Sequence, residues 1–94
     1  MVDEQSGEGA EHSLTIVAEV IGYFRALRSR QETPLVEPAV RVVSGQVLGF
    51  IEALGLMHDV VSPVTGRIAK VVVRADSPVE YGQVLFLIDP AEDS

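Results

Sequence analysis

A four-residue sequence, Gly-Gln-Val-Leu, occurs twice in this 94-residue chain, beginning at Gly45 and again at Gly82. The offset of 37 residues between the copies is shared by further pairs, which are Val42 with Val79, Ile51 with Ile88 and Glu52 with Asp89. Repeats usually extend into solenoids, but two copies are too few, because a stable solenoid needs about three. Two interlocked copies that close one small barrel therefore fit this chain better.

A second pair of matching segments places an insertion inside the first copy. The sequence Val-Ile-Gly that ends at Gly22 matches Val-Thr-Gly ending at Gly66, and here the offset is 44 residues. The first copy therefore holds seven extra residues between Gly22 and Gly45. We place them around residues 27–36, where the strand pattern lapses, and we expect them to protrude from the barrel like a finger.

Short apolar runs separated by turn residues follow one another along the chain. We expect strands at residues 14–22, 40–43, 47–53, 57–61, 67–74, 79–80 and 84–89. Residues 23–30 permit a strand, a loop or a single helical turn, and residues 31–38, which include two prolines, predict an irregular loop. So many short strands between turns indicate an all-β barrel or sandwich.

Two of the expected strand regions carry more specific predictions. Residues 47–53 and 57–61 form a hairpin with its corner at Leu54-Gly55, because glycine accepts the positive φ that two-residue turns require. Residues 67–74 alternate with a period of two, which favours Ala69, Val71 and Val73 as the face toward the core.

The formal net charge of −7 lies mainly at the ends of the chain. Residues 14–89 hold eight acidic residues against all seven basic residues. We therefore predict a disordered acidic tail at residues 1–13, one domain at residues 14–90 and a short tail at residues 91–94.

Composition also excludes several classes of protein. The sequence has no basic stripe with interleaved aromatic residues, which argues against nucleic-acid binding. No apolar run approaches the ~20 residues of a membrane span, and the N-terminus lacks the basic and apolar regions of a signal peptide. The absence of cysteine excludes disulfides and thiolate chemistry. We expect a soluble cytoplasmic protein that binds neither nucleic acid nor membrane.

Several motifs together carry a resemblance to a known family. They are Glu-Ala-Leu-Gly-Leu at residues 52–56, Ser-Pro-Val-Thr-Gly at 62–66, Lys70, Pro-Val-Glu-Tyr-Gly-Gln at 78–83 and Leu-Phe-Leu-Ile at 85–88. The run from Gly22 to Asp89 resembles the biotinyl domain of biotin carboxyl carrier protein, a subunit of bacterial-type acetyl-CoA carboxylase. The resemblance implies a flattened barrel of two four-stranded antiparallel sheets related by a pseudo-twofold axis, with a thumb-like insert at residues 27–36.

The chain departs from that family at the residue that carries the cofactor. The family has a Glu-Ala-Met-Lys-Met motif at a hairpin tip, and its lysine is joined to biotin by an amide bond. The resemblance places Gly55 at the lysine position, with Leu54 and Leu56 at the flanking methionines. Biotinylation and lipoylation both need a primary amine at the turn, which glycine lacks. The only lysine, Lys70, falls in an expected strand. We therefore expect no attached cofactor and no catalytic activity.

Two groups of residues are candidates for contact with a partner. Leu54, Leu56 and Met57, together with Gly55, place apolar side chains at the expected hairpin tip, where a solvated turn favours polar ones. The second group leads into the predicted insert with no acidic residue between its members, which suits an acidic partner surface; it comprises Arg25, Arg28 and Arg30.

Other polar residues are interpreted as structural. His58 stands beside Asp59, but a second cluster of ligands is missing, so we expect a surface histidine and no metal site. Glu52 and Asp89 occupy equivalent positions of the repeat, and their symmetry suggests equivalent ends of paired strands rather than a catalytic pair of carboxylates.

The resemblance leads to three functional hypotheses. The first is a non-biotinylated carrier-like protein that regulates or scaffolds an acetyl-CoA carboxylase, in contact with its biotin carboxylase or carrier subunit; relatives without the lysine are negative regulators of plastid acetyl-CoA carboxylase. The second is a carrier-like domain recruited to another, specialised-metabolite pathway as a docking, small-molecule-binding or catalytic module. The third is an active carrier modified at another residue. The oligomeric state and the partner's identity stay open.

Overall fold

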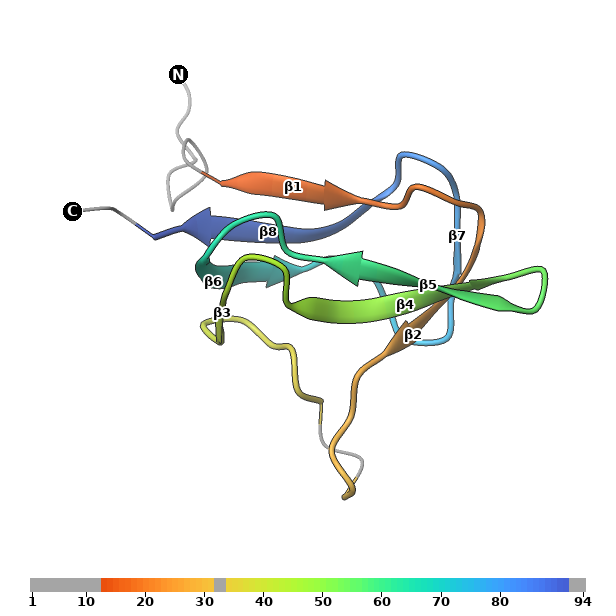
Figure 1. The fold of residues 1–94 in the computed structure, drawn as a ribbon, viewed down its shortest axis with the longest axis horizontal. Coiled ribbons are helices and arrows are strands. Elements are labelled where there is room, and N and C mark those ends of the chain that lie inside the picture. Colours follow the sequence, from red (N-terminus) through yellow and green to blue (C-terminus); the bar gives the residue numbers. More distant parts are fainter. Residues whose placement is uncertain (1–12, 32–33, 92–94) are drawn as a thin grey trace.

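The computed structural model describes residues 13–31 and 34–91, and within these ranges the chain forms eight β-strands and no helix (Figure 1). The strands are β1 (Leu14–Val17), β2 (Gly22–Ala26), β3 (Arg41–Val42), β4 (Val47–Ala53), β5 (Leu56–Val61), β6 (Gly66–Val71), β7 (Pro78–Val79) and β8 (Val84–Pro90). The prediction of an all-β protein is confirmed.

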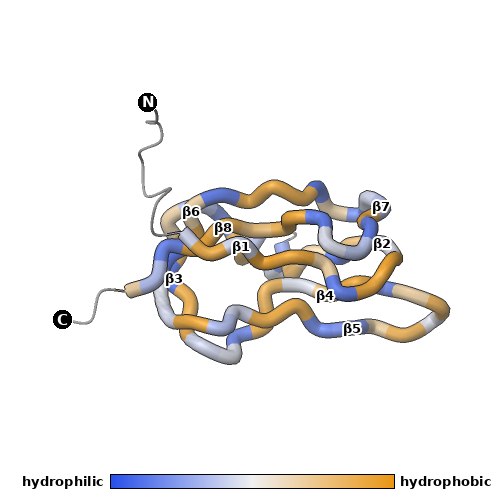
Figure 2. Tube along the Cα trace, turned by 90° about the horizontal axis from the view of Figure 1, so that it is seen from above, coloured by the Kyte–Doolittle hydropathy of each residue, from blue (hydrophilic) through white to orange (hydrophobic). Residues whose placement is uncertain are grey.

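The strands form two four-stranded antiparallel sheets, in the orders β1-β8-β6-β3 and β5-β4-β2-β7. Figure 2 shows β8 and β1 in one layer, with β4 and β5 in the other. Each sheet takes two strands from the first half of the chain and two from the second. The two orders correspond position by position: β1 matches β5, β8 matches β4, β6 matches β2 and β3 matches β7, so that matching strands are always four places apart in the chain. A twofold axis between the sheets produces this relation. The predicted pair of interlocked copies is therefore confirmed.

The repeated Gly-Gln-Val-Leu sequence forms equivalent turns before β4 and β8. Gln46 Oε1 accepts a hydrogen bond from the backbone N–H of Val43 at 2.9 Å, and Gln83 Oε1 accepts one from the N–H of Glu80 at 3.0 Å. The glycines of the two copies have φ of 89° and 84°, and the leucine that ends each copy is fully buried. The repeat thus encodes a turn closed by its own glutamine, followed by the first core residue of a strand.

The core lies between the two sheets and holds one aromatic pair. Phe24 on β2 and Phe86 on β8 belong to different sheets, and their rings meet edge to face with centroids 5.8 Å apart and planes 69° apart. The remaining buried hydrophobic residues surround this pair; they are Ile16, Ala18, Val42, Leu48, Ile51, Val60, Ile68, Val73, Val79, Leu85 and Ile88.

The single strand expected at residues 14–22 is wrong, because the chain leaves the first sheet after Val17. Ala18 is fully buried; its N–H donates to the carbonyl of Gln83 at 2.9 Å, and its carbonyl accepts from the N–H of Gly82 at 2.8 Å. These bonds hold the chain at the turn before β8, and residues 18–21 then cross to the second sheet. Residues 14–17 and residues 18–21 both include β-branched residues, so local composition contained no signal for the break.

The predicted core face of residues 67–74 is also partly wrong. Val73 is buried and Val71 packs against the core, but Ala69 is exposed and Ile68 takes the buried position. The register between β6 and β8 shifts between Ile68 and Lys70, and an irregularity of this kind changes which face a side chain points to.

The connection between β2 and β3 extends away from the barrel (Figure 1). Of residues 23–30, for which a strand, a loop and a helical turn were left open, residues 23–26 are strand. The remaining four lie outside the named strands, and an isolated bridge joins Arg28 to Pro34. Residues 32–33 lie outside the described residues, and the thumb-like insert at residues 27–36 stays a prediction. The irregular loop predicted at residues 31–38 is compatible with the described part of it.

The predicted tails fall mostly outside the described residues, namely at 1–12 and 92–94. Ser13 and Ala91 are described and are bonded to the barrel: Ser13 Oγ donates to Asp89 Oδ1 at 2.7 Å, and the N–H of Ala91 donates to the carbonyl of Thr65 at 2.8 Å. Across the described residues, no helix has the length and apolarity needed to span a membrane. The cytoplasmic location and the domain boundaries stay predictions.

Two symmetry-related glycines lie where a side chain has no room, and this leads to a prediction. A Cβ at Gly22 would overlap the backbone oxygen of Glu52, and a Cβ at Gly66 would overlap that of Asp89. We expect Gly22→Ala and Gly66→Ala each to lower the free energy of unfolding by about 2–3 kcal/mol, measured by urea denaturation, because a backbone atom cannot rotate away. Gly45→Ala is the control.

The control has open space but an unfavourable backbone conformation. No atom lies within 4 Å of a Cβ at Gly45, whose φ is 89°, so alanine there costs about 1 kcal/mol. Equal losses at Gly22, Gly66 and Gly45 would contradict the close approach of the strands.

Candidate functional site

The β4–β5 hairpin turns at Leu54 and Gly55, as predicted. Ala53 pairs with Leu56, and the two residues between them have positive φ, 52° at Leu54 and 81° at Gly55. Positive φ at both central positions defines a type I′ turn, whose twist matches that of antiparallel strands. A leucine in this left-handed conformation lowers the free energy of unfolding by roughly 1–2 kcal/mol, so Leu54 destabilises the turn that it occupies.

The tip of this hairpin is apolar and projects from the barrel (Figures 1 and 2). The exposed fraction is 101% at Leu54, 64% at Leu56 and 53% at Met57. At Gly55 no atom lies within 4 Å of the position that a Cβ would occupy. The structure therefore brings these four predicted site residues together; we call Leu54, Gly55, Leu56 and Met57 the hairpin tip.

An ion-pair network lies behind the hairpin tip on the outer face of the same sheet. Arg25 on β2 contacts Glu52 at 2.9 Å and Asp76 at 2.9 Å, and its guanidinium lies 5.6 Å from the ring centroid of Tyr23. Hydrogen bonds to Asp76 and then to Glu52 raise the pKa of Arg25 above its ordinary value. Arg25 therefore stays charged, and much of its charge is compensated within the chain.

The other two predicted arginines lie outside the close contacts of this ion-pair network. Arg28 approaches Asp76 Oδ2 at 3.9 Å, and Arg30 is exposed. The sequence reasoning missed Asp76, because it lies 51 positions from Arg25 in the chain and only the fold brings them together. The role of these arginines as contacts for an acidic partner stays a prediction.

The pseudo-twofold axis provides an internal comparison for the hairpin tip. Strand register places Tyr23, Glu52 and Met57 in one row across β2, β4 and β5. The equivalent row across the other sheet is polar. In the strand register Arg67 of β6 lies opposite Asp89 of β8, and Asp89 accepts a hydrogen bond from Ser13. The pair β1–β8 corresponds to the hairpin pair β5–β4, but β1 and β8 are not consecutive in the chain, so no hairpin turn joins β1 to β8. The exposed apolar residues therefore mark one of two equivalent ends, and symmetry alone does not require them.

The remaining candidate residues lie apart. Glu52 is paired with Arg25 and Asp89 with Ser13, in different sheets, so each carboxylate has its own structural partner. Lys70 is exposed in the interior of β6. Within the described part of the chain, no group of three or more histidine, cysteine, aspartate or glutamate side chains is placed to hold a metal ion.

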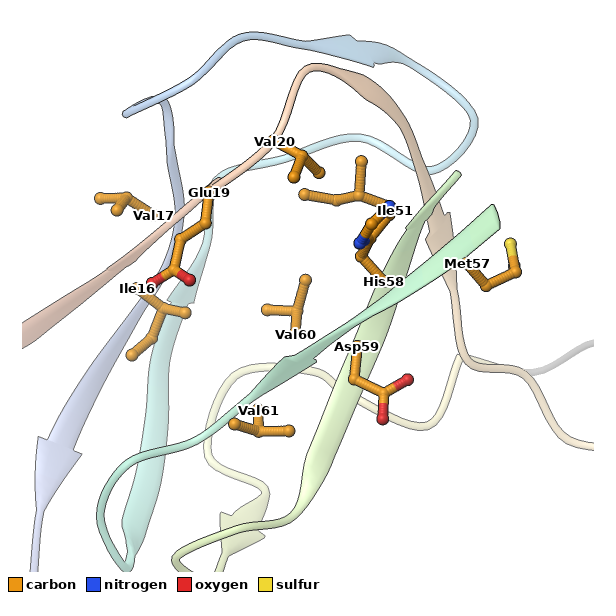
Figure 3. A pocket seen from close by; sticks show the side chains of 10 residues that line it. All are labelled: Ile16, Val17, Glu19, Val20, Ile51, Met57, His58, Asp59, Val60 and Val61. Carbon is orange, nitrogen blue, oxygen red and sulfur yellow. The ribbon is translucent and has the colours of Figure 1, made fainter. Parts of the chain in front are cut away.

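A groove that the sequence did not indicate opens between β1 and β5. It has a cavity volume of about 560 Å³, and its lining includes half-buried His58 (Figure 3). The lining residues come from three strands, β1, β4 and β5, and from the crossing segment at 18–21, so no local pattern could have revealed the groove.

The sequence and the fold are similar to those of carboxylase carrier domains. A sequence model of the biotin–lipoyl family, described as "Biotin-requiring enzyme", matches residues 16–88. The biotin carboxyl carrier protein of acetyl-CoA carboxylase from Nostoc sp. is 32% identical over 75 residues, which are 80% of this chain and 41% of that protein. The chain thus spans less than half of that relative's length.

Solved structures of larger carboxylases contain the same fold. A single-chain, multi-domain long-chain acyl-CoA carboxylase matches with a TM-score of 0.72 at 16% identity, over 98% of this chain and 8% of that one. The urea carboxylase of Kluyveromyces lactis matches with a TM-score of 0.66 at 19% identity, over 94% and 7%. Together with the family match over residues 16–88, the two packed four-stranded sheets and the projecting hairpin lead to one conclusion: this chain belongs to the biotin–lipoyl family and is similar to biotin carboxyl carrier proteins.

Proposed function

We propose that this chain is a non-biotinylated, carrier-like domain that acts by protein–protein contact in an acetyl-CoA carboxylase-type complex. Its partner is a biotin carboxylase or a carrier subunit, and it regulates the complex or helps to hold it together. The observation that carries the proposal is Gly55 at the apex of the β4–β5 hairpin, where the chain offers no side chain.

The chemistry of attachment supports this proposal. Joining biotin or lipoate to a protein forms an amide, so the protein must supply a primary amine at an accessible position. The motif correspondence sets Gly55 against the family's lysine, and a glycine supplies no such amine. Lys70 lies in β6, which is paired with β8 on one side and β3 on the other, so its amine is not presented at a turn.

The hairpin tip supports a role in binding. A domain with the shape of a carrier but a bare apex would occupy a carrier's position without transferring a group. Leu54 and Leu56 expose apolar surface that would be buried at a contact, and apolar patches rimmed by polar residues are typical of interaction sites.

The first test is the intact mass of the protein after incubation with biotin protein ligase, biotin and ATP. We expect no added mass, while a lysine-bearing carrier domain treated in parallel gains one biotinyl group. A biotinyl group on Lys70 would overturn the proposal. Incubation with a lipoate ligase extends the same test to the other prosthetic group.

The second test measures binding to purified biotin carboxylase and to purified carrier subunit. We expect one of them to bind the chain, and the triple variant Leu54→Ser, Leu56→Ser, Met57→Ser to bind it at least about tenfold more weakly, because burying each large apolar side chain contributes roughly 1.5–3 kcal/mol. Val72→Ser, Tyr81→Ser is the control, since both residues are exposed outside the hairpin tip. Binding of neither subunit would remove the proposal.

A second candidate function is a small-molecule-binding module in another pathway. It is favoured by an apolar pocket of about 180 Å³ under the β2–β3 connection, lined in part by Phe24, Leu27, Val36 and Phe86. Capture of the chain by a pathway enzyme instead of a carboxylase subunit, together with a ligand in this pocket, would favour it over the first proposal.

A further inference from the structure

The groove between β1 and β5 is bordered by two unpaired strand edges, one from each sheet. β1 pairs only with β8, and β5 only with β4, among the strands that the structure describes. Residues of both strands line the groove, so the two edges border it from opposite sides. An edge strand presents a row of backbone N–H and C=O groups that can pair with a further strand.

The hairpin turn determines which residues of β5 present these groups. The turn makes Ala53 and Leu56 a hydrogen-bonded pair, and in an antiparallel ladder such pairs alternate with pairs that do not bond. Leu56 and His58 therefore bond to β4, whereas Met57 and Asp59 direct their backbone groups toward the groove. Both are among its lining residues.

The floor of the groove reaches the core. Ile16 and Val60 are symmetry-related core residues, and they stay 8% and 7% exposed, whereas Leu48 and Ile88 are completely covered. In Figure 3, Val20 and Val60 point into the space between the two chain segments. An added strand would therefore meet apolar side chains on its inward face.

The rim of the groove is acidic. Glu19 points toward the groove from the crossing segment, whereas Asp59 lies on the outer side of β5 (Figure 3). No lysine or arginine is among the lining residues. A residue of an added strand that faced outward beside Asp59 would form a cross-strand pair with it, and opposite charges favour such pairs. A second copy of this chain would bring its own acidic rim and a formal net charge of −7, which disfavours self-pairing.

We propose that this groove binds an extended segment of a partner protein that alternates apolar and basic residues and adds as a strand to the free edge of β5. The apolar residues would lie beside Val60, and the basic residues beside Asp59 and Glu19. Backbone hydrogen bonds to Met57 and Asp59 provide part of the affinity, and the alternating side chains provide the specificity. This inference goes beyond the proposed function, because Leu54 and Leu56 of the hairpin tip do not line the groove.

The test is an NMR titration of the isotope-labelled chain with the capped peptide acetyl-(Val-Lys)₃-amide. We expect saturable shifts centred on the amides of Met57 and Asp59, with slowed hydrogen exchange there. Asp59→Lys should weaken binding about tenfold at low salt, because it replaces an attraction by a repulsion, and added salt should weaken binding to the native chain. Glu37→Lys is the matched control, since Glu37 is exposed and lies outside the groove; it should leave the affinity unchanged.

Two control peptides separate the parts of the proposal. Acetyl-(Val-Glu)₃-amide should not bind, and a Val-Lys peptide with alternate backbone nitrogens methylated should lose binding, because it cannot donate along the edge. Equal binding of either peptide, no binding of the Val-Lys peptide, or concentration-dependent self-association through β5 would each overturn the proposal. The binding test of the hairpin tip shares Met57 with the groove, but it measures binding of whole carboxylase subunits and also changes Leu54 and Leu56, which do not line the groove. Failure of one proposal therefore does not remove the other.

Discussion

Gly55→Lys, combined with Leu54→Met and Leu56→Met, is expected to turn this chain from a protein that biotin ligase leaves unmodified into one that is almost fully biotinylated. The triple change restores the Glu-Ala-Met-Lys-Met motif on the existing turn. The apex is already exposed, and no atom lies within 4 Å of the new Cβ, so the lysine side chain would extend into solvent. The measurement is intact mass after incubation with biotin ligase, biotin and ATP.

The substitution is compatible with the fold. The φ of 81° at Gly55 costs an L-residue roughly 1–2 kcal/mol. That cost is small beside the roughly 5–15 kcal/mol by which a domain is usually stable, so the variant should remain folded. Circular dichroism and a melting curve verify this before the mass is interpreted.

Gly82→Lys is the matched control for this experiment. Gly82 has a φ of 84° and equally open surroundings, but it lies in the turn before β8 instead of the hairpin. We expect it to stay unmodified. If the folded Gly55→Lys triple variant also stayed unmodified, the correspondence between Gly55 and the family's lysine position would be wrong.

Phe86→Ala is expected to lower the free energy of unfolding by about 3–5 kcal/mol. The ring is buried, and it forms the edge-to-face pair with Phe24 that joins the two sheets. Removing it leaves a cavity and deprives Phe24 of its aromatic partner. At about 4–8 °C for each kcal/mol in a domain of this size, the melting temperature should fall by roughly 12–40 °C.

Phe86→Leu separates loss of volume from loss of the ring. Leucine keeps most of the apolar volume, so it should cost less than about 2 kcal/mol. Both variants are measured by urea denaturation and by thermal melting. A loss below about 1 kcal/mol for Phe86→Ala would contradict the placement of this ring at the centre of the core.

The hairpin and its turn were predicted correctly because their signals are local. A glycine at the corner and two apolar arms are sufficient to set a two-residue turn, and the structure has Leu54 and Gly55 at positive φ. The strand at residues 47–53 was predicted with its observed bounds for the same reason. The predicted tip residues therefore lie together on one hairpin.

The errors arose where long-range contacts decide the local geometry. The break after Val17 depends on hydrogen bonds from Ala18 to the turn before β8, 64 and 65 positions further along the chain. The reversal of faces at Ile68 and Ala69 depends on a shift in pairing with β8. Neither contact can be predicted from the residues next to it in the sequence, because the partner strand is distant in the chain.

The sequence alone determined that two similar halves form one all-β barrel, and that one projecting turn has glycine at its apex. Both follow from periodicity and turn chemistry, which act over a few residues. Only the tertiary structure decided that Asp76 forms an ion pair with Arg25 and that β1 and β5 leave a groove between their free edges. It also decided that the exposed apolar residues of the hairpin tip lie at one of two symmetry-related ends. These features depend on which distant strands become neighbours, and that is settled by packing of the two sheets around a shared core.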